Sequence, residues 1–501
     1  MKRRTIPVRI EKLDFPNRAK GYELLDREEG SVEERLEIAS GTNQQNLERG
    51  RAIVAKGGLP GQVWMAKTGR NRAGAKECKL LELLERSSLE TEAGCSICDQ
   101  CGGCCYQKLS FQTELLLKGH QLRDLYREAG LFEEIPLTHS PLVHGYRNKM
   151  EYTFGDREKG GPLTLGLHRP GHFYEIIPTP DCNIVPEDFN TLRSYSQDFF
   201  RKAGLPYYHR SRRQGILRHL VLRASLTKKQ LMVNLVTTFA LESDDPIWAE
   251  YLQGLQGLDL EFSLASVYHT RNDSPADAVI PEELTLQWGR PYLEERLHDL
   301  QFHVGPFSFF QPNVAGAERL YAKALEFAGD LSGKTVYDLY SGTGTITQIL
   351  ARHARRAIGV ELVEEAVEKA RESAQLNELA NVKWVANDVL KELDRMAREE
   401  EAPDVIVLDP PRQGIHPKAL PKICAAGADR IVYISCNPIT QVHDILEMEK
   451  FGYKAEKACA FDQFPRTKHV ETVALLSKLD VDKHINIEIE LDELDLTSAE
   501  S

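Results

Sequence analysis

The C-terminal part of the chain alternates short apolar runs with segments in which apolar residues recur every three to four positions. The helical segments include 363–378 and 418–426. The apolar runs have the length of β-strands and lie at 335–340, 356–361, 382–386, 404–409, 431–436 and 470–476. This alternation predicts an α/β fold, with a doubly wound sheet that carries helices on both faces.

The first 87 residues show a different pattern, with short strand-like runs. These runs lie at 8–13, 51–55, 62–66 and 77–83, and turns such as Pro60-Gly61 separate them. The pattern predicts a small β-barrel of the kind that holds nucleic acid. The acidic segment 23–49 is expected to be an insertion between its strands. Basic residues from Lys67 to Lys79 are compatible with bound RNA, and equally with a solvated hairpin.

Residues 91–300 mix both patterns, which predicts an α+β central domain. A strong helical period runs from 111 to 129, and further helices are expected near 186–203 and 246–255. Strand-like runs lie at 218–223, 231–237 and 264–270. We therefore divide the chain into a barrel at 1–90, a central domain at 91–300, a doubly wound domain at 301–477 and an acidic tail at 478–501.

The charge of the chain is concentrated in two segments. The 501 residues are 42% hydrophobic and 28% charged, as in soluble globular proteins, and carry a net charge of −12. Residues 21–50 hold eight acidic and three basic residues and residues 478–501 hold eight and two, which together give −11. The rest of the chain is nearly neutral, so the net charge does not exclude an RNA partner. We interpret the tail as a solvated extension.

The chain contains ten cysteines, and five of them lie between Cys95 and Cys105. The basic start, Met1-Lys-Arg-Arg, leads into no apolar stretch of signal-peptide length, and no apolar run is long enough to span a membrane. We therefore expect a cytoplasmic protein. Because the cytosol keeps thiols reduced, disulfides are not expected, and the crowded cysteines indicate a metal site.

Two further stretches of the central domain combine basic and aromatic residues. They are Tyr146-Arg-Asn-Lys149 and His209-Arg-Ser-Arg-Arg213, the second of which follows Tyr207 and Tyr208. Cations pair with phosphates and rings stack on bases, so the combination favours single-stranded RNA. Charged surface loops without a specific partner are the common alternative.

The loop after the first strand of the doubly wound domain has the features of a cofactor site. It reads Asp338-Leu-Tyr-Ser-Gly342-Thr-Gly344, and its glycines let a nucleotide-like ligand lie against the backbone. Glu361 ends the second strand, 23 residues after Asp338, where it can accept hydrogen bonds from ribose hydroxyls. Asp388 follows the third strand and can accept one from an adenine amino group. NAD and S-adenosylmethionine both fit this set.

The fourth strand favours S-adenosylmethionine. It ends in Asp409-Pro-Pro-Arg412, at the carboxyl edge of the sheet where ligands of such folds bind. The rigid Asp-Pro-Pro turn is typical of methyltransferases that act on base rings or exocyclic amines. The amine-acting enzymes have an aromatic residue after the prolines, and Arg412 is not aromatic, so a carbon target is favoured. Thr347, in place of a third glycine, fits a donor without a pyrophosphate.

Methyl transfer to a base carbon such as C5 of uracil needs a nucleophile and a base. C5 becomes reactive toward a methylsulfonium once a thiolate has added to C6 and formed an enolate. Cys436, in Ser435-Cys-Asn-Pro438 at the end of the fifth strand, can supply the thiol. Glu471, in His469-Val-Glu-Thr-Val, can accept the C5 proton, after which the thiol leaves. A lone cysteine there is more often an inert buried thiol, but the neighbouring motifs favour a nucleophile.

Together these motifs resemble those of the S-adenosylmethionine-dependent RNA uracil-5-methyltransferases. The motifs are Asp-Leu-Tyr-Ser-Gly-Thr-Gly, Asp-Pro-Pro-Arg, Ser-Cys-Asn-Pro, His-Val-Glu-Thr-Val and Phe309-Phe-Gln-Pro-Asn313. The resemblance covers nearly the whole chain and implies a class I methyltransferase domain. It also implies a TRAM or OB-like barrel, through Gly50-Arg-Ala-Ile-Val and Leu59-Pro-Gly61.

The resemblance assigns roles to individual residues. Cys436 would be the nucleophile and Glu471 the base. Gly342 would make room, with Gly344, for the methionine end of the donor. The other residues that would contact S-adenosylmethionine are Gln311, Tyr340, Glu361, Asp388 and Asp409.

Two ligand sets are open for the metal site. The spacing C-x2-C-x2-C-x3-C is similar to that of ferredoxins, although Tyr106 replaces the usual proline; it is formed by Cys95, Cys98, Cys101 and Cys105. The family pattern implies a different set, formed by Cys95, Cys101, Cys104 and Cys182. We adopt the family set, with a [4Fe-4S] cluster of structural or RNA-orienting role. Four thiolates suit zinc equally well.

The barrel and the cysteines resemble the branch of the family that acts on 23S ribosomal RNA, because the transfer-RNA branch lacks both. We therefore expect a monomeric enzyme that forms 5-methyluridine in 23S ribosomal RNA. One alternative is an RNA cytosine-5 methyltransferase, although those enzymes usually carry Pro-Cys where this chain has Pro410-Pro411. A second is a non-catalytic RNA-binding or ribosome assembly factor, against which the intact Cys436 and Glu471 argue.

Overall fold

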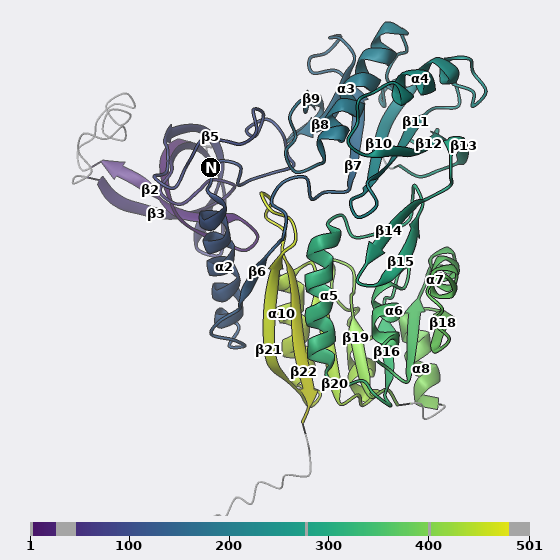
Figure 1. The fold of residues 1–501 in the computed structure, drawn as a ribbon. Helices are drawn as coiled ribbons and strands as arrows, with labels where there is room; N and C mark the ends of the chain where they lie inside the picture. Colours follow the sequence, from purple (N-terminus) through teal and green to yellow (C-terminus); the bar gives the residue numbers. More distant parts are fainter. Residues whose placement is uncertain (1–3, 27–46, 276–278, 399–401, 480–501) are drawn as a thin grey trace, which may run out of the picture.

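The computed structural model describes residues 4–26, 47–275, 279–398 and 402–479 (Figure 1). A small barrel lies to one side, a central domain forms the upper lobe of Figure 1, and the doubly wound domain forms the lower lobe. This arrangement confirms the predicted fold class. In the described ranges, no helix is both long and apolar enough to cross a membrane.

The barrel is closed, with the strand order β1-β2-β3-β5-β4. Its strands are β1 (Thr5–Asp14), β2 (Arg18–Asp26), β3 (Leu47–Lys56), β4 (Val63–Arg72) and β5 (Ala75–Glu85). Apolar side chains such as Val8 and Ile53 fill its interior. The sequence did not predict β2, because its residues are mostly polar. Most of the expected acidic insertion, residues 27–46, lies outside the described residues, between β2 and β3.

The central domain is built on a seven-stranded sheet in the order β13-β12-β11-β10-β7-β8-β9. Its strands are β7 (Lys149–Gly155), β8 (Thr164–Arg169), β9 (His172–Pro178), β10 (Leu217–Ser225), β11 (Gln230–Thr237), β12 (Ser263–Arg271) and β13 (Glu283–Gly289). Helices α3 (Glu187–Lys202) and α4 (Ile247–Gln256) pack on it through buried rings that include Phe189 and Trp248. The hairpin of β14 (Leu293–Leu297) and β15 (Leu300–Val304) leads into the lower lobe.

The doubly wound domain contains an eight-stranded sheet in the order β18-β17-β16-β19-β20-β22-β21-β6. Its strands are β6 (Leu137–His139), β16 (Thr335–Leu339), β17 (Arg356–Glu361), β18 (Val382–Ala386), β19 (Val405–Leu408), β20 (Arg430–Ser435), β21 (Tyr453–Asp462) and β22 (Glu471–Lys478). The helices that follow the strand pattern are α5 (Val314–Ala328), α6 (Thr345–Ala351), α7 (Glu364–Leu376), α8 (Val389–Arg398), α9 (Leu420–Ala425) and α10 (Pro438–Glu449). The strands from β16 to β20 are parallel, so their carboxyl ends meet at one edge.

One edge of this sheet is completed by residues from well before the domain. The short strand β6 pairs in parallel with β21, and α2 (Phe111–Glu128) adds Leu122 and Tyr126 to the core beneath it. The sequence did not predict β21, because Lys454, Glu456 and Lys457 interrupt its apolar pattern. The chain before the central sheet is thereby tied to the segment that leads into β22.

Candidate active site

The predicted cofactor loop connects β16 to α6 and is held by Glu361 at the end of β17. The Gly342 amide donates to Glu361 Oε2 at 3.0 Å, and the Val363 amide donates to Oε1 of the same carboxylate at 3.0 Å. Gly342 has φ +54, and a Cβ atom there would meet nothing within 4 Å. Glu361 therefore fixes the loop, and Gly342 leaves open space beside it.

Gly344 has a different reason to be glycine. Its φ is +78, and a Cβ atom there would lie 2.1 Å from the Trp384 ring of β18. From the sequence we expected Gly344 to make room for a ligand. The space that a Cβ atom of Gly344 would fill is instead occupied by the Trp384 ring.

Two polar atoms at the start of this loop lack a hydrogen-bond partner within the described residues. They are Ser341 Oγ and Asp338 Oδ1, both buried. The other oxygen of Asp338 accepts a bond from the Thr347 hydroxyl at 2.5 Å. Burial raises the pKa of Asp338 to about 7. A buried polar atom without a partner is costly, so a polar ligand at this loop fits the donors and acceptors that are present.

The other predicted cofactor residues surround the same edge. Tyr340, with φ +70, donates its amide to the Val360 carbonyl at 3.0 Å. Asp388 caps the start of α8, because its Oδ1 accepts from the Leu390 amide at 3.0 Å, which leaves the other oxygen to contact a ligand. The Gln311 carbonyl accepts from the Asn148 side chain at 3.0 Å. Contacts with the central domain therefore hold the Gln311 loop.

The predicted nucleophile and base lie on neighbouring antiparallel strands. Ser435 of β20 pairs with Thr472 of β22, so Cys436 and Glu471 occupy the next positions along the two strands. Cys436 is half-buried, whereas Glu471 is 7% exposed. This register brings the thiol and the carboxyl group to the carboxyl edge of the sheet.

The acidic groups at this edge influence one another. Burial raises the pKa of the Cys436 thiol, and the carboxyl groups of Glu471 and Asp409 raise it further. Burial, followed by the nearby Asp409, raises the pKa of Glu471 well above its usual value. Burial also raises the pKa of Asp409 to about 7. Arg412, which donates a hydrogen bond to Cys436, opposes these effects on both Cys436 and Glu471.

The segment that leads into Glu471 is pinned by a buried ionic network. Lys118 of α2, 2% exposed, donates to Glu114 and to Asp462, each at 2.7 Å. The Arg466 amide donates to the same Glu114 carboxylate at 2.7 Å. The Arg466 carbonyl accepts from the amides of Cys105 and the following residue, at 2.9 and 3.1 Å. The position of Glu471 thus depends on α2 and on the cysteine-rich segment.

His469 lies two residues before Glu471, in the same segment. Its amide donates to the Thr467 hydroxyl at 3.2 Å, and its ring makes an edge contact with Phe464. Burial, followed by the nearby Arg412, lowers the pKa of His469 to about 4. The imidazole is therefore neutral at physiological pH.

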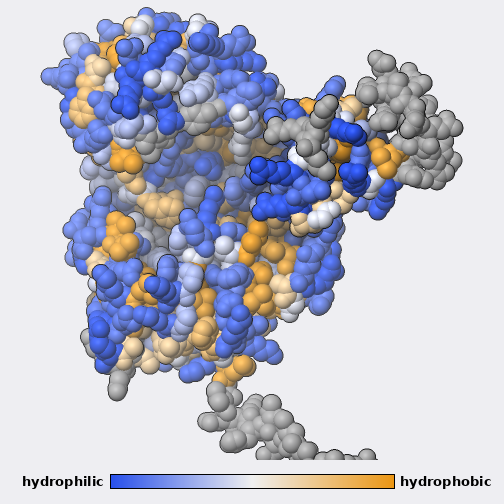
Figure 2. Space-filling view, turned by 180° about the vertical axis from the view of Figure 1, so that it is seen from behind, coloured by the Kyte–Doolittle hydropathy of each residue, from blue (hydrophilic) through white to orange (hydrophobic). Residues whose placement is uncertain are grey.

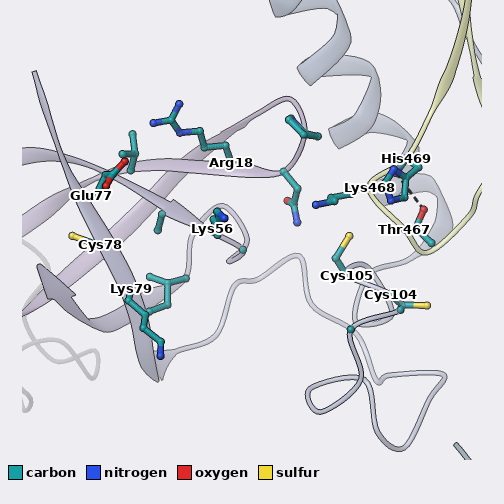
Figure 3. Close-up of a pocket in the computed structure, with 18 of the residues that line it drawn as sticks. Arg18, Lys56, Glu77, Cys78, Lys79, Cys104, Cys105, Thr467, Lys468 and His469 are labelled. Carbon is teal, nitrogen blue, oxygen red and sulfur yellow. Dashed lines mark hydrogen bonds between the residues drawn. The ribbon is translucent and has the colours of Figure 1, made fainter. Parts of the chain in front are cut away.

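Two neighbouring cavities with shared wall residues lie near this edge, and Arg412 lines one of them. The first, here called the central cavity, has a volume of about 790 Å³ and lies between the central and doubly wound domains. Basic residues on its wall are Arg147, Lys149, Arg223 and Arg412. The second, the barrel cleft, has about 1010 Å³ and separates the barrel from Lys468 and His469 (Figure 3). Its basic residues from the barrel are Arg18, Lys56, Arg72 and Lys79.

Seen from behind, the exterior of the barrel and of the upper lobe is largely hydrophilic, and apolar residues gather in the recess next to them (Figure 2). The two cavities share Cys104 and His469. A long polyanion could therefore pass from the barrel to the carboxyl edge of the sheet without leaving a basic wall.

The cysteines divide between the two cavities. The thiols on the wall of the central cavity are those of Cys95, Cys98, Cys101, Cys104 and Cys182. Cys105 lines the barrel cleft instead, and its sulfur points away from that of Cys104 (Figure 3). Gln107 donates to Cys104 Sγ at 3.6 Å and to Asn183 Oδ1 at 2.8 Å, which ties Cys104 to the neighbour of Cys182.

Within the described ranges, no three His, Cys, Asp or Glu side chains are placed so that they could hold one metal ion. The thiols nevertheless differ in their surroundings. Cys182 interacts electrostatically with Cys101 and Cys95, and Cys104 with Cys182, Cys101 and its neighbour Cys105. Cys105 instead faces Lys118, Glu114 and Lys468. The central cavity is lined by all four cysteines of the family set and by Cys98 of the ferredoxin-like set, so the choice between the two sets stays a prediction.

Sequence reasoning missed two residues of this site. Asn148 holds the Gln311 loop through its amide and side chain, and only its place between basic residues drew attention to it. Tyr321 of α5 is buried, shares a hydrogen bond with Gln311 and lies near Asp409 and Glu471. Its helical spacing is that of an ordinary core residue, so no sequence signal marks it.

The interpretation of Tyr146 as a base-stacking ring is wrong. Tyr146 is fully buried, and its hydroxyl donates to the Pro465 carbonyl at 2.8 Å. The ring therefore supports the segment before Glu471 and is not available to RNA.

Comparison with known proteins identifies relatives along most of the chain. A family model described as tRNA (uracil-5-)-methyltransferase matches residues 286–479. An uncharacterized RNA methyltransferase from Caldanaerobacter subterraneus subsp. tengcongensis is 43% identical over 86% of this chain and 94% of the relative. One from Clostridium tetani is 41% identical with the same coverage of both chains.

A solved structure shares the fold. The crystal structure of Pyrococcus abyssi tRNA (uracil-54, C5)-methyltransferase in complex with S-adenosyl-L-homocysteine matches with a TM-score of 0.70 at 24% identity. The match covers 94% of this chain and 99% of that chain. At this identity the likeness shows the fold alone.

Proposed function

The chain belongs to the RNA uracil-5-methyltransferase family, and from this premise we propose that it methylates C5 of a uridine in 23S ribosomal RNA. The observation that carries the proposal is the register of β20 and β22, which sets Cys436 beside Glu471. Asp409 and Arg412 lie close enough to change the pKa of both groups. A thiol, a carboxylate and a cation at one sheet edge are the groups that this chemistry requires.

S-adenosylmethionine supplies the methyl group when bound at the loop after β16. The open space at Gly342 and the unpaired Ser341 Oγ support this location. Glu361 would accept bonds from the ribose hydroxyls, because its two oxygens each have a lone pair left after binding the backbone amides. We propose that the other contacts come from Gln311, Tyr340, Asp388 and Asp409. A related crystal structure with S-adenosyl-L-homocysteine supports the same choice of cofactor.

We propose that Cys436 adds to C6 of the target uracil. The raised pKa means that the thiol keeps its proton in the free protein at neutral pH. The hydrogen bond from Arg412 stabilises the thiolate that forms when the proton leaves. The new S–C6 bond moves the C5–C6 electron pair onto C5 and O4. C5 would then attack the methyl carbon, whose bond to the sulfonium sulfur breaks as S-adenosylhomocysteine leaves.

Glu471 completes the reaction in this proposal. The methylated C5 still carries its original proton, and Glu471 accepts it. The electron pair of the C5–H bond reforms the C5–C6 double bond, and the S–C6 bond breaks to release Cys436. Because the pKa of Glu471 is raised, its conjugate acid holds the accepted proton well.

The target uridine would have to leave its stack to reach Cys436, as in other enzymes that react with a base carbon. The central cavity, with about 790 Å³ beside Arg412 and His469, has room for a nucleotide. The barrel cleft would hold the neighbouring backbone, which supports the assignment of the barrel as a TRAM-like RNA-binding module.

The choice of 23S ribosomal RNA rests on the resemblance of the barrel and the cysteines to that branch of the family. A tRNA (uracil-54, C5)-methyltransferase matches 94% of this chain in fold, so the architecture alone does not select the RNA, and the product analysis has to include transfer RNA. We propose that Cys95, Cys101, Cys104 and Cys182 hold a [4Fe-4S] cluster when it is present. Its thiolate ligands would close one wall of the central cavity.

Nucleoside analysis tests the product. Ribosomal RNA and transfer RNA from cells that lack the protein are incubated separately with the protein and S-adenosylmethionine, digested and analysed by mass spectrometry. We expect 5-methyluridine from 23S ribosomal RNA. Detection of 5-methylcytidine would favour the cytosine-5 alternative, and 5-methyluridine only in transfer RNA would contradict the ribosomal substrate. Absence of cofactor binding by calorimetry would favour a non-catalytic assembly factor.

A further inference from the structure

A small hollow lies on the central domain, away from Cys436. It has a volume of about 50 Å³ and is formed by residues of β7, β8 and β9 and of the segment before β10. Its wall contains three aromatic rings, Tyr174, Tyr207 and Tyr208, together with the basic residues Arg210 and Arg218. We call it the tyrosine hollow. Neither Cys436, the cofactor loop nor the cysteine-rich segment contributes to it.

Two of its rings are fixed by the protein itself. The Tyr207 hydroxyl donates to Asp156 Oδ2 at 3.0 Å, and the same oxygen accepts from the Gly160 amide at 2.8 Å. The Arg218 guanidinium lies 4.7 Å from the centre of the Tyr208 ring and is anchored behind it by the Asn272 carbonyl. A ring that is already held in place loses little entropy when a ligand stacks on it.

The third ring is the most exposed of the three. Tyr174 of β9 is 68% exposed, the highest exposure among the large apolar and aromatic side chains of the described residues. An exposed ring next to guanidinium groups is the combination that single-stranded nucleic acid uses, because bases stack on the ring and phosphates pair with the cations.

Positive charge continues along the neighbouring turn. Arg212 and Arg213 follow Tyr208 in the chain and are both exposed. Arg213 has φ +53, and its amide donates to the His209 carbonyl at 2.8 Å, so the turn has a defined shape. Phosphate groups of a bound strand would lower the repulsion between these cations.

The tyrosine hollow and the central cavity lie on two sides of one residue. His168 of β8 lines both. On β7, Glu151 lines the central cavity and Thr153 lines the hollow; the two side chains lie on the same face of the strand, about 7 Å apart along it. A few nucleotides of extended RNA would cover this distance.

We propose that the tyrosine hollow binds an unpaired base of the substrate RNA, a few nucleotides from the target uridine. The hollow is too small to enclose a base, so the base would stack on the tyrosine rings and its sequence would matter little. The inference rests on the proposed function, because the RNA strand that reaches the hollow is the one whose target uridine lies in the central cavity.

RNA affinity of the full-length protein tests this subsite without any methyl transfer. The probe is a fluorescein-labelled 20-nucleotide oligouridylate, measured by anisotropy. We expect Tyr174→Ala to weaken binding about fivefold or more, because stacking on one aromatic ring contributes on that scale. Tyr174→Phe, which keeps the ring, should bind like the wild type. Phe451→Ala removes another exposed ring, which is 48% exposed, lies between α10 and β21 and lines neither the hollow nor the two large cavities; it should leave the affinity unchanged.

A crosslinking arm locates the contact. An oligouridylate of the same length with 4-thiouridine should crosslink to peptides that contain Tyr174 or Tyr208, as identified by mass spectrometry. Unchanged affinity of Tyr174→Ala, crosslinks confined to other peptides, or no binding of the probe to the wild type would each overturn the subsite. If Tyr174→Ala weakens binding while the wild type forms no 5-methyluridine, the subsite stands and the proposed function fails.

Discussion

Cys436, Asp409 and Glu471 each hold a proton more tightly than they would in water, mainly because they are buried. Arg412 is the group that opposes this effect for Cys436 and Glu471. The raised pKa values reduce the negative charge of the free site at neutral pH, which would make entry of the proposed RNA substrate less costly. Formation of the thiolate then becomes the step that depends on pH and on Arg412.

The pH dependence of methyl transfer follows from these shifts. A thiolate and a carboxylate exist only above their pKa values, and these pKa values are raised, so the single-turnover rate should increase with pH across the neutral range. Replacing Arg412 with Gln removes the charge that lowers both pKa values, so the rising part of the profile should move to higher pH. Arg412→Lys, which keeps the charge, is the control. An unchanged profile for Arg412→Gln would contradict the assignment.

Two substitutions separate the roles of thiol and carboxylate. Cys436→Ala should abolish methyl transfer, because no covalent addition to C6 can occur. In Glu471→Gln, Cys436 should still add to C6, and C5 of the uracil should still take up the methyl group. The variant cannot remove the C5 proton. We therefore expect a covalent protein–RNA adduct that survives denaturing electrophoresis. Methylation by Cys436→Ala would show that the nucleophile is a different residue.

At the scale of elements, the site depends on packing that joins distant parts of the chain. The cofactor loop is shaped by Trp384 of β18, and Glu471 is held by α2 through Lys118 and Arg466. The residues that make these packing contacts support the fold, and they differ from the residues proposed to contact ligands.

The two glycines of the cofactor loop should respond differently to alanine. Gly344→Ala adds a methyl group that would lie 2.1 Å from Trp384, and should destabilise the domain by about 2–4 kcal/mol through overpacking and the left-handed backbone. Gly342→Ala meets open space and should cost only about 1 kcal/mol. Thermal unfolding and calorimetric binding of S-adenosylmethionine measure both. We expect Gly342→Ala to lose affinity while it remains folded; equal loss of stability in the two variants would contradict this division.

The buried ionic network gives a second prediction at this scale. Lys118→Met removes the cation that Asp462 and Glu114 share and leaves Glu114 with Arg466 alone, 3.5 Å away; removing one partner of a buried ion pair costs about 3–5 kcal/mol. The melting temperature should fall by several degrees. The triple variant Lys118→Met/Glu114→Gln/Asp462→Asn, which has no buried charge at these positions, should recover part of the loss. If Lys118→Met alone were as stable as the wild type, the network would not hold the segment before Glu471.

Local patterns predicted the strands that carry Asp409, Cys436 and Glu471, because apolar runs and their polar ends are encoded within a few residues. They did not predict β2 or β21, whose polar residues hide the strand period, and they gave no reason for Asn148 or Tyr321. The roles of those two residues depend on contacts with Gln311, far away in the sequence. The resemblance gave the candidate site residues, while their registers and charges required the fold.

At the scale of the whole molecule, the barrel, the central domain and the doubly wound domain meet around two neighbouring cavities. Cys104 and His469 lie on both, and the cysteine-rich segment contacts Arg466 in front of Glu471. A metal held by these cysteines would therefore stiffen the wall of the RNA path.

The metal ligands can be tested one by one. Anaerobically purified protein should show the broad visible absorption of an iron–sulfur cluster. Cys182→Ser should lose most of this absorption, whereas Cys105→Ser and Cys98→Ser should retain it. Cys105 faces the barrel cleft and is the matched control. Colourless protein with one equivalent of zinc would support the other metal, and loss of absorption only in Cys105→Ser would support the ferredoxin-like ligand set.

The central claim is that Cys436 and Glu471 together replace the C5 proton of a uridine with a methyl group. Tritium release measures this directly. The protein is incubated with 23S ribosomal RNA carrying tritium at uracil C5, with and without S-adenosylmethionine. We predict that the wild type releases tritium into water only when S-adenosylmethionine is present. Neither Cys436→Ala nor Glu471→Gln should release it. RNA that gains a methyl group without releasing tritium would contradict this prediction.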